Sequence, residues 1–266
     1  MTSAAPDAVA HIRAEAQRFA DVLGHADPSA PVPTCPDWDA TDLAWHLSEV
    51  HLFWGLILQR HALTSDHLDG VEAAKPARPA GMAAILSVRA EATRALLGEL
   101  SSRNAADPAW TWFPPDQSVG FVRRMQTHEA TIHRHDAELT AGLPVSPVPD
   151  WVADDGIDHA VDVMISPPTW ASVEAPRSVE LVASDTGKRV VLALGRWRGT
   201  GPESGTEFDE PAAVRADEAT PTPTATVTAP ATELYRWLWG RPAEVERSGA
   251  SATLKALDSV VAVGID

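Results

Sequence analysis

Residues 128–133 read His-Glu-Ala-Thr-Ile-His, inside a segment (residues 120–141) whose apolar positions recur at helical spacing. Glu129 and His133 are four positions apart, so their side chains leave the same face of the predicted helix. Apolar residues on this face, Val122 among them, would bury it in a helical core. A carboxylate and an imidazole buried without partners cost several kcal/mol. A metal ion removes this cost, because it satisfies both side chains at once.

A third candidate ligand lies on another predicted helix, residues 42–63, where His46 falls among apolar residues. His46, Glu129 and His133 together offer two imidazoles and one carboxylate. Catalytic zinc sites use three protein ligands of this kind and leave one coordination position open. The alternative is an ordinary surface pair, since the chain has 10 histidines and a Glu–His pair at this spacing also arises by chance.

Other polar residues near these positions have simpler expected roles. His51 is five positions past His46 and points away from it, so it is a poor co-ligand. His128 and His135 leave other faces of their helix and are expected at the surface. Asp136, one turn beyond His133, has two open roles: it orients the His133 ring as a hydrogen-bond acceptor, or it is a solvated charge.

The whole first half of the chain is helical in pattern. Residues 7–23 and 82–100 predict two further amphipathic helices, which makes four in total and favours an antiparallel bundle. Residues 67–79 and 104–118 are expected to be irregular loops. We therefore predict a metal-binding four-helix bundle over residues 1–147.

Beyond a proline-rich stretch at 144–149 the pattern changes, and residues 148–266 predict a small α+β domain. Two β-rich runs flank the turn signal Asp-Thr-Gly-Lys at 185–188, which is typical of a hairpin. The other predicted elements are helices at 151–165 and 231–239 and a strand at 222–228.

Composition excludes several classes of partner. The formal net charge is −16, which argues against nucleic acid or an anionic membrane as partner, because both attract basic patches. No apolar run approaches the roughly 20 residues needed to cross a bilayer. Cys35 is the single cysteine, so no internal disulfide is possible, and no signal peptide is indicated. A cytoplasmic protein is expected.

Three stretches carry a resemblance to a known family. Residues 32–47 (VPTCPDWDATDLAWHL) and 124–138 (RMQTHEATIHRHDAE) resemble the second and fourth helices of mycothiol-dependent maleylpyruvate isomerases. That family belongs to the DinB-like metal-binding four-helix bundles. Residues 226–241 (TVTAPATELYRWLWGR) resemble its second domain, which is likened to sterol carrier proteins. The resemblance assigns the family's metal ligands to His46, Glu129 and His133.

The resemblance implies an enzyme that uses zinc or another divalent metal, with mycothiol as thiol cosubstrate. A thiolate that adds to an activated cis double bond and leaves after rotation gives cis–trans isomerisation; a thiolate that stays attached gives S-transfer. The partners are then a small-molecule thiol and an electrophilic substrate. The alternative, suggested by the sterol-carrier-like half, is a non-catalytic metal-containing module that binds a small molecule.

One residue of the second half is a candidate for contact with substrate. Arg241 is predicted as a catalytic residue that binds a substrate carboxylate, because a guanidinium matches a carboxylate in geometry. Arg236 stands behind it as the next candidate. The alternative for Arg241 is a charge that caps the C-terminus of its helix.

Overall fold

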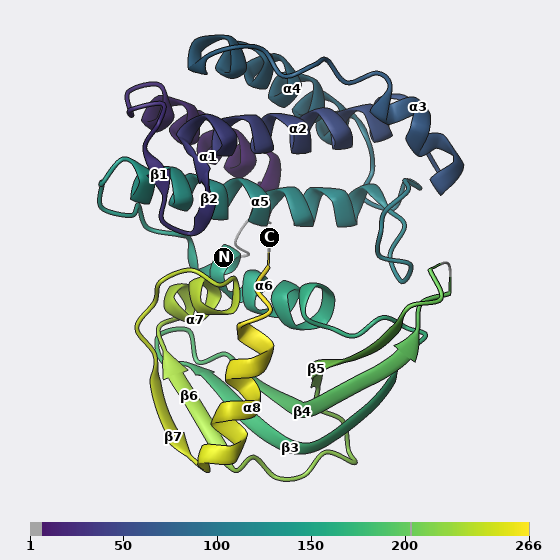
Figure 1. The fold of residues 1–266 in the computed structure, drawn as a ribbon, viewed down its shortest axis with the longest axis vertical. Helices are drawn as coiled ribbons and strands as arrows, with labels where there is room; N and C mark the ends of the chain where they lie inside the picture. Colours follow the sequence, from purple (N-terminus) through teal and green to yellow (C-terminus); the bar gives the residue numbers. More distant parts are fainter. Residues whose placement is uncertain (1–6, 203, 266) are drawn as a thin grey trace, which may run out of the picture. The chain divides into compact units, whose positions relative to one another are not determined.

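The computed structural model describes residues 7–202 and 204–265 and divides the chain into two compact units. The first unit runs to Pro147 and the second begins at Val148. The first is helical, and the second combines a sheet with helices (Figure 1). The predicted fold class, a helical bundle followed by an α+β part, is confirmed.

Four long helices build the first unit. For three of them, the predicted bounds lie within two residues of those in the structure. They are α1 (Ala8–Leu23), α2 (Ala40–Gln59), α4 (Met82–Ser102) and α5 (Val119–Thr140). α2 packs against α4, and α1 packs against α5 (Figure 1). α2 also contacts α5, which brings the two predicted ligand-bearing helices together.

The start of α2 is fixed by a capping box. The Asp39 carboxylate accepts hydrogen bonds from the backbone N–H groups of Thr41 and Asp42, at 2.8 and 2.9 Å. The Asp42 carboxylate accepts from the Asp39 N–H at 3.0 Å. These bonds satisfy amides that the first helical turn leaves unpaired, and they begin the helix two residues earlier than predicted. The helix also ends earlier, at Gln59.

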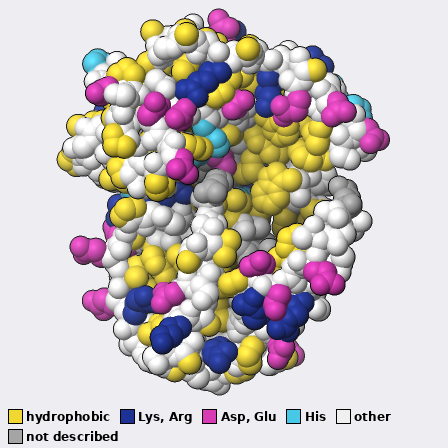
Figure 2. Space-filling model, viewed as in Figure 1, with side chains coloured by type: hydrophobic (Ala, Val, Ile, Leu, Met, Phe, Trp, Pro, Cys, Tyr) yellow, Lys and Arg dark blue, Asp and Glu magenta, His cyan; other side chains and the backbone are white. Residues whose placement is uncertain are grey.

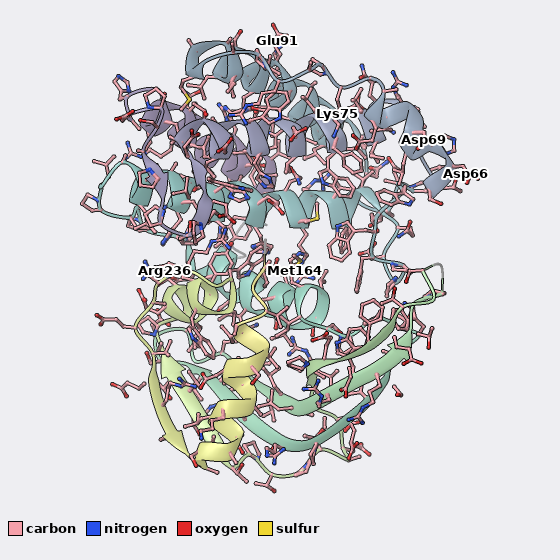
Figure 3. The ribbon with its side chains drawn as sticks, viewed as in Figure 1. Asp66, Asp69, Lys75, Glu91, Met164 and Arg236 are labelled. Carbon is pink, nitrogen blue, oxygen red and sulfur yellow. The ribbon has the colours of Figure 1, made fainter. Side chains whose placement is uncertain are left out.

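The connections between these helices carry short elements that the sequence prediction missed. They are the hairpin strands β1 (Pro31–Val32) and β2 (Cys35–Asp39), a 3₁₀ turn (Ser65–His67) and α3 (Leu68–Glu72). The predicted loop at 67–79 is therefore partly helical. Its Lys75 pairs with Glu72 at 2.6 Å (Figure 3).

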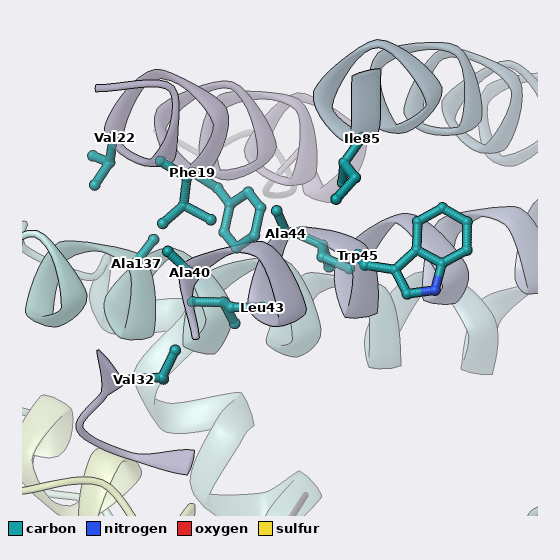
Figure 4. Packing of buried hydrophobic residues seen from close by; sticks show 11 residues of the cluster. Phe19, Val22, Val32, Ala40, Leu43, Ala44, Trp45, Ile85 and Ala137 are labelled. Atoms are coloured by element: carbon teal, nitrogen blue, oxygen red, sulfur yellow. The ribbon is translucent and has the colours of Figure 1, made fainter. Parts of the chain in front are cut away.

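A compact apolar cluster holds α1, α2 and α4 together (Figure 4). Phe19, Leu43 and Ile85 are each at most 1% exposed and come from these three helices. Burial of such side chains contributes about 1.5–3 kcal/mol each. Trp45 belongs to the same cluster, next in sequence to the candidate ligand His46, so the packing of the core fixes this part of α2.

A five-stranded sheet forms the second unit, in the order β5-β4-β3-β6-β7. The strands are β3 (Ser172–Ala183), β4 (Arg189–Thr200), β5 (Glu207–Arg215), β6 (Ala225–Ala229) and β7 (Glu246–Gly249). β3 pairs parallel with β6, and the other pairs are antiparallel. The predicted hairpin joins β3 to β4, but both strands are longer than expected. β5 and β7 were not predicted.

Three helices accompany this sheet: α6 (Asp150–His159), α7 (Ala231–Leu238) and α8 (Ser251–Val261). A π-helical turn, Ala160–Met164, continues α6. α6 and α7 approach closely because Gly156 has no side chain: a Cβ there would lie 2.3 Å from the Tyr235 ring. α8 was not predicted.

Acidic and basic side chains are interspersed on the face shown in Figure 2. Across residues 7–202 and 204–265, no helix combines the length and apolar character needed to cross a membrane.

Candidate metal centre

The three predicted ligands meet in the bundle. His46 lies on the second turn of α2, while Glu129 and His133 lie one turn apart on α5. Their nearest ligand atoms all lie within 4.8 Å of one another, and in the described part of the chain no other histidine, cysteine or carboxylate cluster of this kind occurs. His133 is 2% exposed, and the Glu129 side chain is 14% exposed.

Two of the three distances within this group are close to those around a tetrahedral metal ion. His133 Nε2 lies 3.1 Å from His46 Nε2 and 3.2 Å from Glu129 Oε2. Ligand atoms about 2.0–2.1 Å from a tetrahedral zinc ion lie about 3.3–3.4 Å from one another. The two imidazole rings meet edge to face, with centroids 4.7 Å apart. Both Nε2 atoms therefore converge on the region that the Glu129 carboxylate also borders.

Asp136 holds the ring of His133 from the other side. His133 Nδ1 donates to Asp136 Oδ2 at 3.0 Å, and the Thr34 hydroxyl donates to Asp136 Oδ1 at 2.8 Å. Asp136 is fully buried. Of its two open roles, the structure shows the hydrogen-bond acceptor. A proton held on Nδ1 leaves Nε2 to face His46 and Glu129, as a carboxylate–histidine pair does beside a metal.

The pKa of His133 reflects the two carboxylates beside its ring. Burial alone lowers the pKa of this imidazole, but hydrogen bonds to Asp136 and Glu129 outweigh burial and raise the pKa to about 9. These two carboxylates therefore stabilise a positive charge at the ring. A divalent cation between His46, Glu129 and His133 would meet the same field, so the donor set fits a metal ion.

Packing around His46 comes from the β1–β2 hairpin. The Trp38 ring lies 4.8 Å from the His46 ring, centroid to centroid. Thr34, which holds Asp136, belongs to the same hairpin. The loop before α2 thus supports both histidines, a role that helical spacing alone does not reveal.

Two expectations about neighbouring histidines are wrong. His128 and His135 were expected at the surface, yet they are 0% and 2% exposed. The prediction assumed that α5 has one solvated face. In the structure it is buried on nearly every side, and Glu129 is the least buried residue of its central turns. His51 stays outside the ligand group, as expected, and its Nδ1 lies 2.8 Å from the Thr93 hydroxyl.

The second unit places the predicted arginines in different surroundings. Arg241 is 6% exposed, and its Nη1 donates to the carbonyl oxygens of Trp239 and Ile265 at 2.6 and 2.8 Å. Arg236 lies on α7 (Figure 3) and pairs with Glu233. The contacts of Arg241 stabilise the end of α7 and the C-terminal segment; its catalytic role stays a prediction.

Residues 9–138, which include all three candidate ligands, match the model of the mycothiol maleylpyruvate isomerase N-terminal domain. The first unit of the chain therefore belongs to this domain family. The resemblance predicted from the sequence motifs is confirmed.

Solved structures extend the likeness to the second unit. A mycothiol-dependent maleylpyruvate isomerase aligns over 92% of this chain and 94% of its own, with a TM-score of 0.60 and 12% identity. A variant of such an isomerase with one histidine replaced by alanine gives a TM-score of 0.59 at 11% identity. At this identity the likeness shows a shared fold. No protein of curated function matches the chain in sequence.

Proposed function

We propose that His46, Glu129 and His133 hold a divalent metal ion, most suitably zinc, in an enzyme that acts with a low-molecular-weight thiol. The observation that carries this proposal is the convergence of the three ligand atoms within 4.8 Å, at a partly buried point of the family-matched unit. Two neutral imidazoles and one carboxylate leave a net charge of about +1 on a divalent ion. A thiolate is well suited to the open position of such a site.

Each residue around the centre has a defined task. His46 and His133 offer Nε2, and Glu129 offers a carboxylate oxygen. Asp136 keeps the Nδ1 proton of His133 in place, which fixes the ring orientation. A zinc ion bound there would lower the pKa of a coordinated thiol, so that the thiolate is present at neutral pH.

The names of the family and of the similar structures point to mycothiol as the thiol and to maleylpyruvate as the type of electrophile. Addition of the thiolate to the activated cis double bond leaves a single bond that can rotate. Expulsion of the thiolate then gives the trans isomer and returns the thiol unchanged. If the adduct is protonated and released instead, the outcome is S-transfer to the electrophile. Both outcomes begin with the same addition, so the ligand set supports both.

The test combines metal analysis with turnover on the full chain. We expect one zinc per chain by elemental analysis, and isomerisation or conjugation of maleylpyruvate that requires both mycothiol and the metal. Chelator treatment should abolish turnover, and added zinc should restore it. Stoichiometric zinc without thiol-dependent turnover on this or other cis-enone and epoxide electrophiles would favour the non-catalytic binding module. A chain that takes up no zinc after loading would contradict the metal site.

Asp136→Asn should weaken zinc binding without abolishing it. The amide cannot accept the Nδ1 proton of His133 as strongly as the carboxylate does, and loss of such a partner lowers metal affinity about 10- to 100-fold. Zinc competition with a chromophoric chelator measures the effect. Asp69→Asn, at an exposed position of α3 (Figure 3), is the matched control and should leave the affinity unchanged. Equal affinity of Asp136→Asn and wild type would show that the hydrogen bond does not support the ligand.

A further inference from the structure

A second polar site lies in the groove between α1 and α4. Its volume is about 390 Å³, and its lining includes Arg13, Arg89 and Arg94 together with Gln17 and Thr93. None of the lining residues carries a carboxylate. Three guanidinium groups therefore border one groove in a chain whose net charge is −16.

Arg89 is the unusual member of this group. It is 4% exposed, and its Nε and Nη1 atoms have no hydrogen-bond partner among the residues that the structure describes. Its guanidinium lies over the Phe19 ring, with Cζ 5.7 Å from the ring centroid. Because the Arg89 side chain reaches the groove while packed on Phe19, its position is fixed by the core.

The charge of Arg89 needs a counterion. Burial lowers the pKa of its guanidinium to about 10, with the field of Asp21 acting in the opposite direction, so the group is still charged at pH 7. The Asp21 carboxylate itself accepts a hydrogen bond from Gln17 Nε2 at 2.8 Å. A buried cation without a hydrogen-bonded anion is strongly unfavourable, and natural proteins pair such groups.

We propose that the groove between α1 and α4 is a binding site for a small oxyanion, with Arg89 as the buried cation. Arg13 and Arg94 are exposed and add positive charge at the rim. Guanidinium groups bind phosphate and carboxylate oxygens through paired charge-assisted hydrogen bonds. The volume also admits a small organic acid that carries such a group.

This site uses helices that do not supply the candidate metal ligands. His46 lies on α2, and Glu129 and His133 lie on α5, whereas the arginines lie on α1 and α4. Anion binding can therefore be measured independently of metal content. Zinc analysis of the same samples separates a failure of this proposal from a failure of the proposed enzyme function.

The test is a titration of the full chain with inorganic phosphate at constant ionic strength, with chloride as the replaced anion. Wild type should bind one phosphate per chain by calorimetry, and the Tm of its first unit should rise by about 9 °C at a concentration of about 100 times Kd. Arg89→Met should weaken this affinity at least about tenfold, because it removes a charge-assisted hydrogen-bond donor. Arg189→Met, at an exposed surface pair on β4, should bind phosphate as wild type does.

Stability in chloride gives a second readout. Methionine fills the apolar part of the arginine site without burying a charge, so Arg89→Met should be as stable as wild type in chloride, or more stable. In phosphate, wild type should be more stable than Arg89→Met. If Arg89→Met does not fold, the double variant of the exposed residues, Arg13→Gln with Arg94→Gln, should weaken phosphate binding in a folded chain.

A parallel titration with succinate distinguishes the source of the oxyanion. Tighter binding of phosphate supports a free or esterified phosphate, and tighter binding of succinate supports an organic acid. Either result supports the site when Arg89→Met binds the preferred anion more weakly than wild type does. No saturable binding of either anion, or equal binding by wild type and the arginine variants, would overturn the proposal.

Discussion

His133→Ala should lose its zinc and lower thiol-dependent turnover by at least about three orders of magnitude. Removal of one ligand leaves His46 and Glu129, and two ligands hold zinc far more weakly than three. The chemistry attributed to the metal amounts to several kcal/mol of barrier, and about 4 kcal/mol corresponds to a thousandfold in rate. Zinc content by elemental analysis and turnover with mycothiol measure the two effects together.

His46→Ala separates loss of metal from loss of structure. His133 also satisfies the buried Asp136, so His133→Ala leaves a carboxylate supported by Thr34 and should lower the stability of the fold as well. His46 is only half-buried, and its removal should cost less stability at a similar loss of zinc. His67→Ala, at an exposed histidine, is the matched control. Full zinc content in His46→Ala would place this residue outside the ligand set.

The helices of the first unit were predictable because local signals agree with tertiary packing. Asp39 and Asp42 form the capping box that begins α2, and the apolar residues of α1 recur at the spacing that the core requires. The grouping of Glu129 and His133 followed from their spacing on one helix. The prediction that His46 joins them required only the assumption that α2 and α5 are neighbours in the bundle.

The support around the ligands could be foreseen only in part. Asp136 was a candidate because it lies one turn from His133. Its other partner, Thr34, comes from a hairpin 102 residues earlier in the chain, and no local pattern connects the two. His128 and His135 were misplaced for a related reason. Helical periodicity assumes one solvated face, whereas α5 has polar residues buried on several faces.

The missed strands of the second unit show a different limit. β7 has the sequence Glu-Arg-Ser-Gly, and all four of its residues are exposed, so it has no alternation of apolar and polar side chains. It is a strand because its backbone pairs with β6. β5 begins with acidic residues and buries only two alanines. Edge strands of this kind depend on a neighbouring strand more than on their own composition.

Buried polar residues recur across the bundle, and they differ in how their charges are satisfied. Asp136 is satisfied by a histidine and a hydroxyl, whereas Arg89 has two guanidinium nitrogens without a partner in the described chain. Glu138 is the best satisfied of them. Its fully buried carboxylate accepts hydrogen bonds from Arg18, Arg134 and Ser146. The Ser146 backbone N–H is one of these donors, which fixes the chain just before the end of the first unit.

Glu138→Gln should destabilise the first unit by about 3 kcal/mol at pH 7, a loss of roughly 10 °C in its Tm. Burial alone raises the pKa of Glu138, but the hydrogen bonds from Ser146, Arg18 and Arg134 outweigh it and hold the pKa at about 2. An unfolded glutamate titrates near 4.5. The folded state therefore gains full stability from this carboxylate above the unfolded value, and loses it as pH falls from about 4.5 towards 2.

Calorimetry of wild type and Glu138→Gln between pH 7 and pH 3 tests the direction of this pH dependence. The wild type should lose stability in the acid window, while the variant should show a flatter pH dependence, because glutamine does not titrate. Hydrogen exchange at the Ser146 amide should be faster in the variant, since that N–H donates to the Glu138 carboxylate. Glu91→Gln, at an exposed position of α4 (Figure 3), is the matched control and should change neither quantity. If Glu138→Gln has wild-type stability and the same slope with pH, the buried carboxylate contributes nothing net to the fold, because its desolvation cancels its hydrogen bonds.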